Sequence, residues 1–335
     1  MKQIVTITAP AGIPAAFREG LETDKGRDND TVITVKELRK SYGGTAVVDG
    51  ISFEVRRGEI FGLLGPNGAG KTTTTEIIEG LRDADSGHVS LLGMNGLSRS
   101  SACKERIGIQ LQAPSLLPLL TVEEHIALFG KVYRQCLPVK QVMEFVSLTD
   151  CSNKLTKNLS GGQQQRLSVA LALVNDPEIA FLDEPSTGLD PQSRRGLWET
   201  IEAMKSRGKT IFLTTHFMEE AERLCDRLAI MDHGRIIALG APQQLIDTYF
   251  PESAIQFDSE ASLDPAVLEG LPGVTHVTRD DGEVVMYTAD IPATITSVMQ
   301  LARDRGIENK LKNLHVRQST LEDVFIKLTG RRIRN

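Results

Sequence analysis

The sequence is poor in cysteine and has no long apolar run. Its four cysteines, Cys103, Cys136, Cys151 and Cys225, lie far apart and form no C-x-x-C pair. Neither a zinc site nor a disulfide framework is therefore expected, and reduced thiols are the default. No segment approaches the roughly 18 uninterrupted apolar residues that a membrane-spanning helix needs. Threonines and prolines interrupt the first residues, so we also expect no secretory signal.

Positive charge is not in excess either. The chain has 38 Lys and Arg against 44 Asp and Glu, a net charge of −6. This balance gives no general attraction for a nucleic-acid backbone, so no nucleic-acid partner is expected. With 335 residues, of which 40% are hydrophobic and 24% charged, the composition is that of a globular protein long enough for two domains.

The distribution of apolar residues predicts an α/β protein. Residues 1–30 are polar and aperiodic, which predicts a disordered tail. Residues 31–250 begin with short apolar runs typical of strands and hairpins. A block at about 103–175, dominated by helical spacing, follows. Strands and helices then alternate, which favours a parallel sheet covered on both faces.

Residues 251–335 have a different pattern of predicted strands and helices. Their apolar runs and turn residues predict the order β-α-β-β-α-β, closed by a further helix. That order is the ferredoxin-like split, so we expect a small α+β accessory domain here.

Residues 65–72 fit the phosphate-loop pattern G-x-x-x-x-G-K-[ST] between an apolar strand and a helix. Backbone N–H groups can wrap a polyanion only where no Cβ collides with it, and the helix N-terminus adds a favourable dipole. Lys71 is expected to neutralise the β- and γ-phosphates, and the Thr72 hydroxyl is expected to bind Mg²⁺. A simple glycine-rich turn is the weaker alternative. The predicted phosphate-binding residues are Gly65, Pro66, Asn67, Gly68, Ala69, Gly70, Lys71, Thr72 and Thr73.

The run 179–182 predicts a buried strand that ends in Asp183 and Glu184. One carboxylate can bind Mg²⁺ while the other orients and polarises the attacking water. We assign the metal to Asp183 and the water to Glu184. An Asp-Glu pair at the end of a strand usually lies in a solvated loop without a function. The phosphate loop upstream favours the catalytic interpretation here.

Residues 159–166 read LSGGQQQR before an apolar helix. Ser160 and Gln163 have the spacing of a capping box, which could be all that the motif does. The consecutive glycines Gly161 and Gly162 also expose backbone N–H donors at the helix start. This arrangement predicts a second anion site, suited to the far side of a γ-phosphate.

The order of these three motifs over residues 32–250 resembles the nucleotide-binding subunits of ABC transporters. The resemblance implies a P-loop NTPase fold with an antiparallel β subdomain and a helical subdomain. It also implies ATP and Mg²⁺ as cofactors and ATP hydrolysis as the reaction. Residues 217–242 and the ending LEDVFIKLTG resemble the exporter branch, which serves drug, lipid, sodium or polysaccharide efflux.

The resemblance assigns four further residues. Tyr42 would stack on adenine, although it could be only a strand-end tyrosine. Gln112 would reach Mg²⁺ and the water, with Gln110 as a competing alignment. Asp190 would contact the opposite subunit and could also be a helix N-cap before a proline. His216 would contact the γ-phosphate and hold the catalytic carboxylate, while the other histidines are expected to be structural.

One chain supplies one phosphate loop and one signature, so the resemblance implies a homodimer, or a pair of nucleotide-binding subunits, with ATP between them. It implies a separate polytopic membrane permease and a peripheral location at the cytoplasmic face of the membrane. One rival is a soluble ABC-type ATPase acting on ribosomes or DNA, disfavoured by the single cassette and the acidic balance. Another is a nucleotide-gated module in which residues 251–335 sense a ligand.

Overall fold

The computed structural model describes residues 30–95, 100–112, 116–250, 252–259, 264–280, 283–307 and 311–330. The tail expected at residues 1–30 lies outside this part, apart from Asp30. The described chain divides into two compact units, one ending at Pro242 and the other starting at Gln243. Helix α9 (Pro242–Tyr249) therefore groups with the second unit, ahead of the boundary expected at residue 250.

The first unit begins with an antiparallel sheet in the strand order β2-β1-β4-β5. Gly43 and Gly44 turn the long β1–β2 hairpin with φ of 55° and 84°, values that favour glycine. Apolar side chains on one face pack into the core of the unit. The strands are β1 (Thr31–Tyr42), β2 (Thr45–Arg56), β4 (Ser86–Leu91) and β5 (Met94–Asn95).

A second sheet in the same unit is mostly parallel, in the order β10-β9-β3-β8-β7-β6. Strands β3, β7 and β8 are buried along their whole length, as expected for strands covered on both faces. Only β10 runs antiparallel, paired with β9. The strands are β3 (Ile60–Leu64), β6 (Ile107–Gln110), β7 (Ile179–Asp183), β8 (Thr210–Thr215), β9 (Arg227–Asp232) and β10 (Arg235–Gly240).

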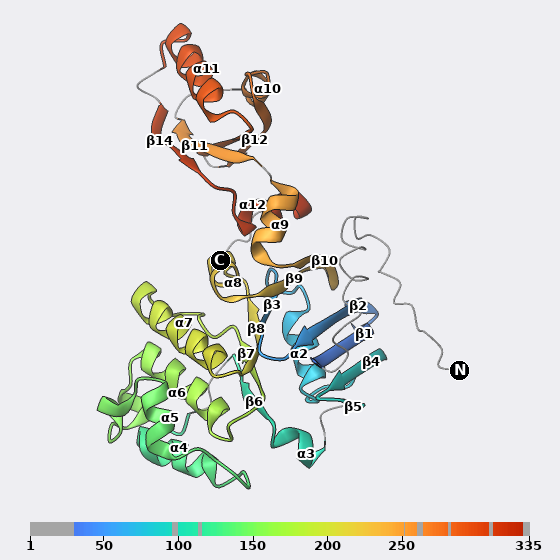
Figure 1. Cartoon of the computed structure of the whole chain (residues 1–335), viewed down its shortest axis with the longest axis vertical. Helices are drawn as coiled ribbons and strands as arrows, with labels where there is room; N and C mark the ends of the chain where they lie inside the picture. The colour runs from blue at the N-terminus through green and yellow to red at the C-terminus, as the bar shows by residue number, and fades with distance from the viewer. Residues whose placement is uncertain are drawn as a thin grey trace. The chain divides into compact units, whose positions relative to one another are not determined.

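Helices surround this sheet, and α4, α5 and α6 lie together away from the antiparallel strands (Figure 1). Helix α2 packs against β7 and β8, and α8 packs against β3 and β8. No helix in the described ranges is long and apolar enough to cross a bilayer. The helices are α2 (Lys71–Ile78), α3 (Ser101–Lys104), α4 (Val122–Gly130), α5 (Val139–Phe145), α6 (Gly161–Leu173), α7 (Pro191–Ser206) and α8 (Met218–Leu224), with short 3₁₀ turns at Thr149–Cys151 and Thr156–Asn158.

The block expected to be helical at about 103–175 also contains strand β6, which pairs with β7. The four residues of β6, with only Ile107 and Ile109 as large apolar side chains, are too few to show a period, so helix and strand cannot be told apart there from sequence. Gly108 explains why the strand fits. A Cβ at Gly108 would lie 1.7 Å from the carbonyl oxygen of Ala172 on α6, so only glycine permits this close approach of helix and strand.

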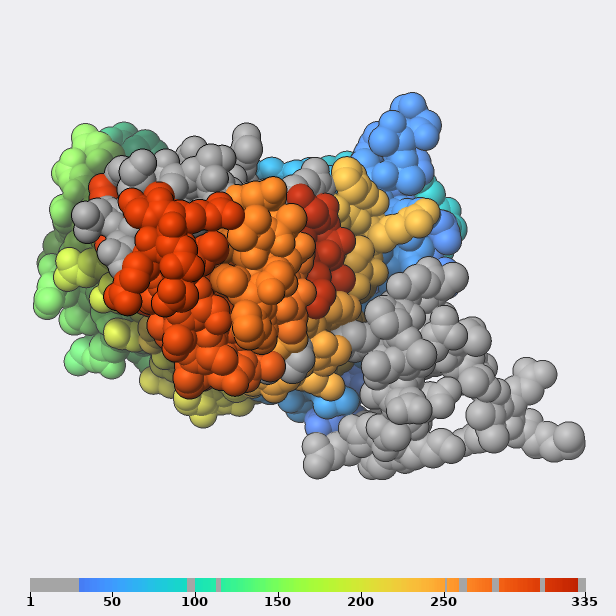
Figure 2. Space-filling view, turned by 90° about the horizontal axis from the view of Figure 1, so that it is seen from above, coloured from blue at the N-terminus to red at the C-terminus, as the bar shows by residue number. Residues whose placement is uncertain are grey.

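The second unit is a four-stranded antiparallel sheet in the order β12-β13-β11-β14, whose elements follow the order β-α-β-β-α-β between α9 and α12. It has its own core, which includes Phe257, Val284, Met286 and Val298. Figure 2 shows its surface in orange and red. Its ferredoxin-like character stays a prediction. The elements are β11 (Ser253–Ser259), α10 (Pro265–Glu269), β12 (Val274–Asp280), β13 (Glu283–Thr288), α11 (Ile291–Asp304), β14 (Leu311–Arg317) and α12 (Leu321–Thr329).

Candidate functional site

The phosphate loop connects β3 to α2 and borders a cavity. Gly70, the N-cap of α2, has a φ of 103° and caps the helix with no side chain. A Cβ there would lie 2.4 Å from the Val47 carbonyl oxygen, so the loop needs glycine at this position. The helix start thus offers backbone N–H donors to an anion. The cavity has a volume of about 280 Å³ and is lined by Val47, Asn67, Gly68, Gly70, Lys71, Thr72, Thr73, Gln112 and Glu184.

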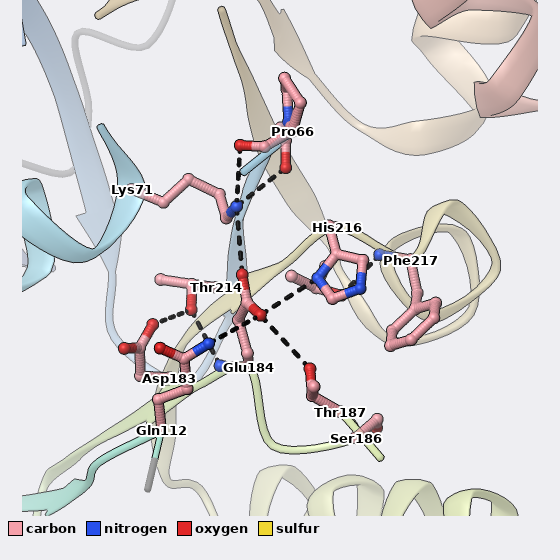
Figure 3. A network of polar contacts seen from close by, with 12 residues as sticks. Pro66, Lys71, Gln112, Asp183, Glu184, Ser186, Thr187, Thr214, His216 and Phe217 are labelled. Atoms are coloured by element: carbon pink, nitrogen blue, oxygen red, sulfur yellow. Dashed lines mark hydrogen bonds and ion pairs between the residues drawn. The ribbon is translucent and has the colours of Figure 1, made fainter. Parts of the chain in front are cut away.

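Lys71 points back over the loop that precedes it. Its Nζ donates to the carbonyl oxygens of Gly65 at 2.9 Å and Pro66 at 3.2 Å. The same nitrogen lies 3.2 Å from Oε1 of Glu184, and both side chains are buried. The structure therefore brings the phosphate-loop lysine and the end of β7 into direct contact (Figure 3).

Glu184 is the centre of a network of polar contacts (Figure 3). Its Oε2 accepts from Gln112 Nε2 at 3.2 Å, Thr187 Oγ1 at 3.3 Å and His216 Nδ1 at 3.1 Å. The hydrogen bond from His216 is the main cause that lowers the pKa of Glu184 to about 2; burial opposes the shift and Lys71 adds to it. Glu184 is therefore ionised at neutral pH, with Lys71 on one oxygen and three donors on the other.

Asp183 lies one residue earlier and accepts from the Thr214 hydroxyl. Burial raises the pKa of Asp183, and the Thr214 hydrogen bond opposes that rise. Thr72, Gln112 and Asp183 offer hydroxyl, carboxamide and carboxylate oxygens, which are the hard donors that Mg²⁺ takes. Thr72 and Gln112 line the same cavity, whereas Asp183 directly precedes the lining residue Glu184 and does not itself line it. The chemistry of the three donors suits Mg²⁺, and their joint binding of the metal stays a prediction.

The two competing glutamines have different environments. Gln110 is 1% exposed, and its Nε2 donates to the Leu111 carbonyl oxygen at 2.6 Å. Gln112 lines the cavity and donates to Glu184. The geometry therefore favours Gln112 as the residue that faces a nucleotide.

Tyr42 lies at the end of β1 and is 41% exposed. Its hydroxyl accepts from Arg82 Nη1 at 2.7 Å, and the Arg82 guanidinium and Lys40 ammonium lie 5.4 Å from the ring centroid. Tyr42 does not line the cavity. Its stacking on adenine stays a prediction.

The signature residues form the start of α6. The Ser160 Oγ accepts from the Gln163 N–H at 3.3 Å, and Gln163 Oε1 accepts from the Ser160 N–H at 3.0 Å. The expected capping box is therefore present. Gly161 is open to solvent, whereas a Cβ at Gly162 would lie 2.5 Å from Ser193 Oγ. None of these residues lines the phosphate-loop cavity of its own chain.

Asp190 is the N-cap of α7, with Pro191 as the first helical residue. Its Oδ1 accepts from the N–H groups of Gln192 and Ser193 at 3.0 Å, and its Oδ2 accepts from Ser193 Oγ at 2.6 Å. These hydrogen bonds, led by the Ser193 hydroxyl, lower the pKa of Asp190. The capping alternative is thus what the structure describes, and the cross-subunit contact stays a prediction.

Three residues of the site were missed by sequence reasoning. Thr187 donates to Glu184, and Thr214 Oγ1 accepts from the Glu184 N–H at 3.0 Å while donating to Asp183. Thr214 does this because it is the cross-strand partner of Asp183 in the β7–β8 pair. Val47 lines the cavity from strand β2. Only the pairing of β7 with β8 could have identified Thr214, and that pairing is not readable locally.

Glu79 is a further missed carboxylate, at the C-cap of α2 and 3% exposed. Burial raises the pKa of Glu79 to about 8, with smaller contributions from the charges of Asp183 and Glu76. The charges of the two buried carboxyl groups, Glu79 and Asp183, therefore act on one another.

Known proteins place this arrangement in a family. Residues 48–187 match the family described as ABC transporter. A relative from Burkholderia lata is 42% identical over 309 residues, which cover 90% of this chain and 98% of the relative. A relative from Ralstonia nicotianae is 39% identical over 92% of this chain and 97% of its own length. Both are named Nod factor export ATP-binding protein I.

Solved structures of ABC transporter subunits are similar to this chain as well. The cbiO1 subunit from Clostridium perfringens, part of the ABC transporter complex cbiONQ, is 30% identical with a TM-score of 0.60, covering 66% of this chain and 92% of that chain. The dimeric cassette MJ0796, in a post-hydrolysis state bound to ADP and Pi, is 25% identical with a TM-score of 0.57, covering 62% of this chain and 98% of that chain.

The P-loop NTPase fold that the resemblance implies is therefore confirmed, and so is ATP hydrolysis as the reaction. The relatives match along most of the chain and not at isolated motifs alone. The chain belongs to the ATP-binding subunits of ABC transporters, of the exporter type.

Proposed function

We propose that two copies of this chain, or this chain and a paired nucleotide-binding subunit, bind two ATP molecules head to tail between them. The start of α6 supports this proposal, because its N–H groups and Ser160 lie outside the phosphate-loop cavity of the same chain. Ser160 and Gly162 of one copy would complete the site that Lys71 and Glu184 build in the other. The dimeric structure of the cassette MJ0796 agrees with such an assembly.

Within each site, the phosphate loop and Lys71 bind the β- and γ-phosphates. Mg²⁺ held by Thr72, Gln112 and Asp183 would supply further charge neutralisation. Glu184 accepts a hydrogen bond from the attacking water and thereby orients it toward the phosphorus. Because Glu184 is ionised, its carboxylate can accept this hydrogen bond and polarise the water.

Glu184 is itself held in place by its neighbours, His216, Gln112 and Thr187, which all donate to one oxygen. The other oxygen is left to Lys71. This network of contacts at Glu184 is the observation that carries the proposal, because it gives a carboxylate at the cavity wall a fixed orientation.

We further propose that the helical block docks on a separate polytopic permease, which places the chain peripherally at the cytoplasmic face of the membrane. Several large apolar side chains between residues 111 and 132 are exposed, as is common at protein contact surfaces. They are Leu111 (52%), Leu117 (46%), Leu119 (70%), Leu128 (43%) and Val132 (75%). Leu111 directly precedes Gln112, so permease contact and the nucleotide site share one segment.

Export is the direction that we propose, since the relatives are named as export proteins. The substrate would be selected by the permease. Co-purification with a polytopic membrane protein is the expected result. Co-purification with rRNA or DNA would instead support a soluble ABC-type ATPase.

The decisive experiment is Glu184→Gln. This variant keeps the shape of the side chain but removes its charge, so it should bind ATP while hydrolysis falls by roughly a hundredfold or more. Size-exclusion chromatography should then show a dimer that persists with ATP. The control is Glu178→Gln, whose carboxylate pairs with Arg57 and Arg106 outside the cavity. Brisk hydrolysis by Glu184→Gln, or a monomer at saturating ATP, would contradict the proposal.

A further inference from the structure

Glu220 is a fully buried carboxylate that the mechanism above does not use. It lies on α8 and is 0% exposed. Its Oε1 accepts from the Ser186 hydroxyl and from Trp198 Nε1, the latter at 2.9 Å. Within the described ranges no hydrogen bond reaches its Oε2, while the Thr215 hydroxyl and the charge of Arg194 also act on the carboxylate. Burying a carboxylate in this way is costly, so a helix that needed only to pack would be better served by an apolar side chain.

Ser186 and Trp198, the two donors to Oε1 of Glu220, both lie in the chain that follows Glu184. Ser186 begins the loop 186–189, and Trp198 lies on α7, which this loop enters through its N-cap Asp190. Between them stands Thr187, whose hydroxyl donates to Glu184 Oε2 (Figure 3). Glu220 therefore fixes the segments on both sides of Thr187.

The other side of Glu184 is tied to the same helix. Helix α8 follows His216 and Phe217, and the Ala221 N–H donates to the Phe217 carbonyl oxygen at 3.2 Å. The His216 and Phe217 rings lie 4.2 Å apart. Two of the donors to Glu184, Thr187 and His216, are thus anchored to segments that meet at Glu220.

We propose that Glu220 is a positioning residue for ATP hydrolysis, which holds the loop 186–189 against the His216 end of β8 so that the Glu184 carboxylate stays oriented. Glu220 acts through Ser186 and Trp198 and does not touch the nucleotide. The inference rests on the proposed role of Glu184. Replacement of Glu220 should therefore lower kcat and leave the affinity for ATP unchanged, because the phosphate loop is not altered.

The test compares the full chain with Glu220→Leu and Glu220→Gln. Glu220→Leu removes the acceptor, so we expect kcat to fall about tenfold through misplacement of Glu184, with an unchanged Kd for ATP. Glu220→Gln keeps an acceptor oxygen and should restore most of kcat. Amide hydrogen exchange at residues 186–189 should be faster in Glu220→Leu and close to wild type in Glu220→Gln.

Trp198 gives an independent signal, because it is the sole tryptophan of the chain. Its indole N–H donates to Glu220, so its fluorescence emission should shift in Glu220→Leu. If that variant does not fold, Ser186→Ala and Trp198→Phe each remove one donor while keeping the carboxylate. Each should then show the same lower kcat at unchanged Kd.

Glu59→Gln is the matched control. Glu59 is 8% exposed, in the same unit, and accepts from the Arg56 N–H at 2.7 Å and from Arg227 Nη1 at 3.1 Å. Its replacement should lower the melting temperature without changing kcat or the exchange at 186–189.

Three results would each overturn the inference. The first is a folded Glu220→Leu variant with the kcat of wild type, and the second is unchanged amide hydrogen exchange at residues 186–189 in that variant. The third is a loss of kcat in Glu59→Gln as large as in Glu220→Leu, since the lower kcat would then reflect general instability. Absence of ATP hydrolysis by the wild-type chain would contradict the proposed function instead. The exchange measurement would still decide whether Glu220 holds the loop.

Discussion

Lys71 and Glu184 form an ion pair of 3.2 Å in which both side chains are almost completely buried. The pair joins the first residue of α2 to the end of β7, so the phosphate loop and the catalytic strand share one electrostatic contact. Removing one partner of a buried pair leaves the other charge uncompensated, which is costly. Lys71 and Glu184 are therefore each expected to affect both the chemistry and the stability of the first unit.

Lys71→Ala should weaken ATP binding. The variant removes an ammonium that would form charge-assisted hydrogen bonds to phosphate, worth roughly 1.5–3 kcal/mol, or about one to two powers of ten in Kd. Calorimetric titration with ATP would measure the change. The control is Lys209→Ala, which breaks a pair with Asp176 and should leave the Kd as it is. An unchanged affinity in Lys71→Ala would remove Lys71 from its role.

The two glutamines should separate activity from stability. Gln112→Ala removes an exposed donor to Glu184, so kcat should fall while the melting temperature is retained. Gln110→Ala removes a buried side chain and should lower the melting temperature instead. ATPase assays and thermal unfolding on both variants would test this contrast, and the reverse pattern would favour Gln110 as the catalytic position.

Replacement of each signature glycine by alanine should change the melting temperature of the isolated chain by a different amount. Gly162→Ala would bring a Cβ within 2.5 Å of Ser193 Oγ, so we expect a lower melting temperature without nucleotide. Gly161→Ala meets nothing within 4 Å and should be neutral or slightly stabilising, because alanine favours helix. Combining Gly162→Ala with Ser193→Gly should recover part of the loss. Equal melting temperatures for the two alanine variants would contradict the packing described here.

Glu79 should make the first unit less stable as the pH rises. Its folded pKa of about 8 lies above its ordinary value of 4.5, so the folded state binds the extra proton between these values. Stability is therefore greatest below about pH 4.5 with respect to this group and falls as the pH rises toward 8. Glu79→Gln should remove this dependence and raise the unfolding free energy at pH 8 by roughly 2–4 kcal/mol. Urea unfolding at pH 5 and pH 8 would show it.

The contribution of Glu184 to stability changes with pH in the opposite direction to that of Glu79. Its folded pKa of about 2 lies below the ordinary 4.5, so its contribution is present above pH 4.5 and is lost as the pH falls toward 2. The difference in unfolding free energy between wild type and Glu184→Gln, measured in urea, should therefore stay constant above about pH 4.5 and shrink as the pH falls from 4.5 toward 2. A difference that does not change between pH 4.5 and pH 2 would contradict the assignment of the shift to Glu184.

Sequence reasoning was strongest where chemistry is local. The phosphate loop, the strand that ends in Asp183 and Glu184, and the capping box of Ser160 each depend on neighbours within a few residues, and the structure has all three. The sequence-based predictions were weakest where a residue's contacts depend on strand pairing. Strand β6 and the contacts of Thr214 arise from how β6, β7 and β8 align, which no local pattern encodes. Thr187 lies three residues before the predicted Asp190, but its hydrogen bond to Glu184 depends on the turn of the loop.

The backbone of Glu184 has a φ of 45°, in the left-handed region that few residues with a side chain adopt. Such a conformation costs of order 1 kcal/mol for a glutamate, and less for glycine or asparagine. The lowering of the Glu184 pKa from 4.5 to about 2 corresponds to roughly 3 kcal/mol of stabilisation of the ionised side chain, which exceeds this cost. A library randomised at position 184 should therefore return Glu when it is selected for heat resistance as well as when it is selected for turnover.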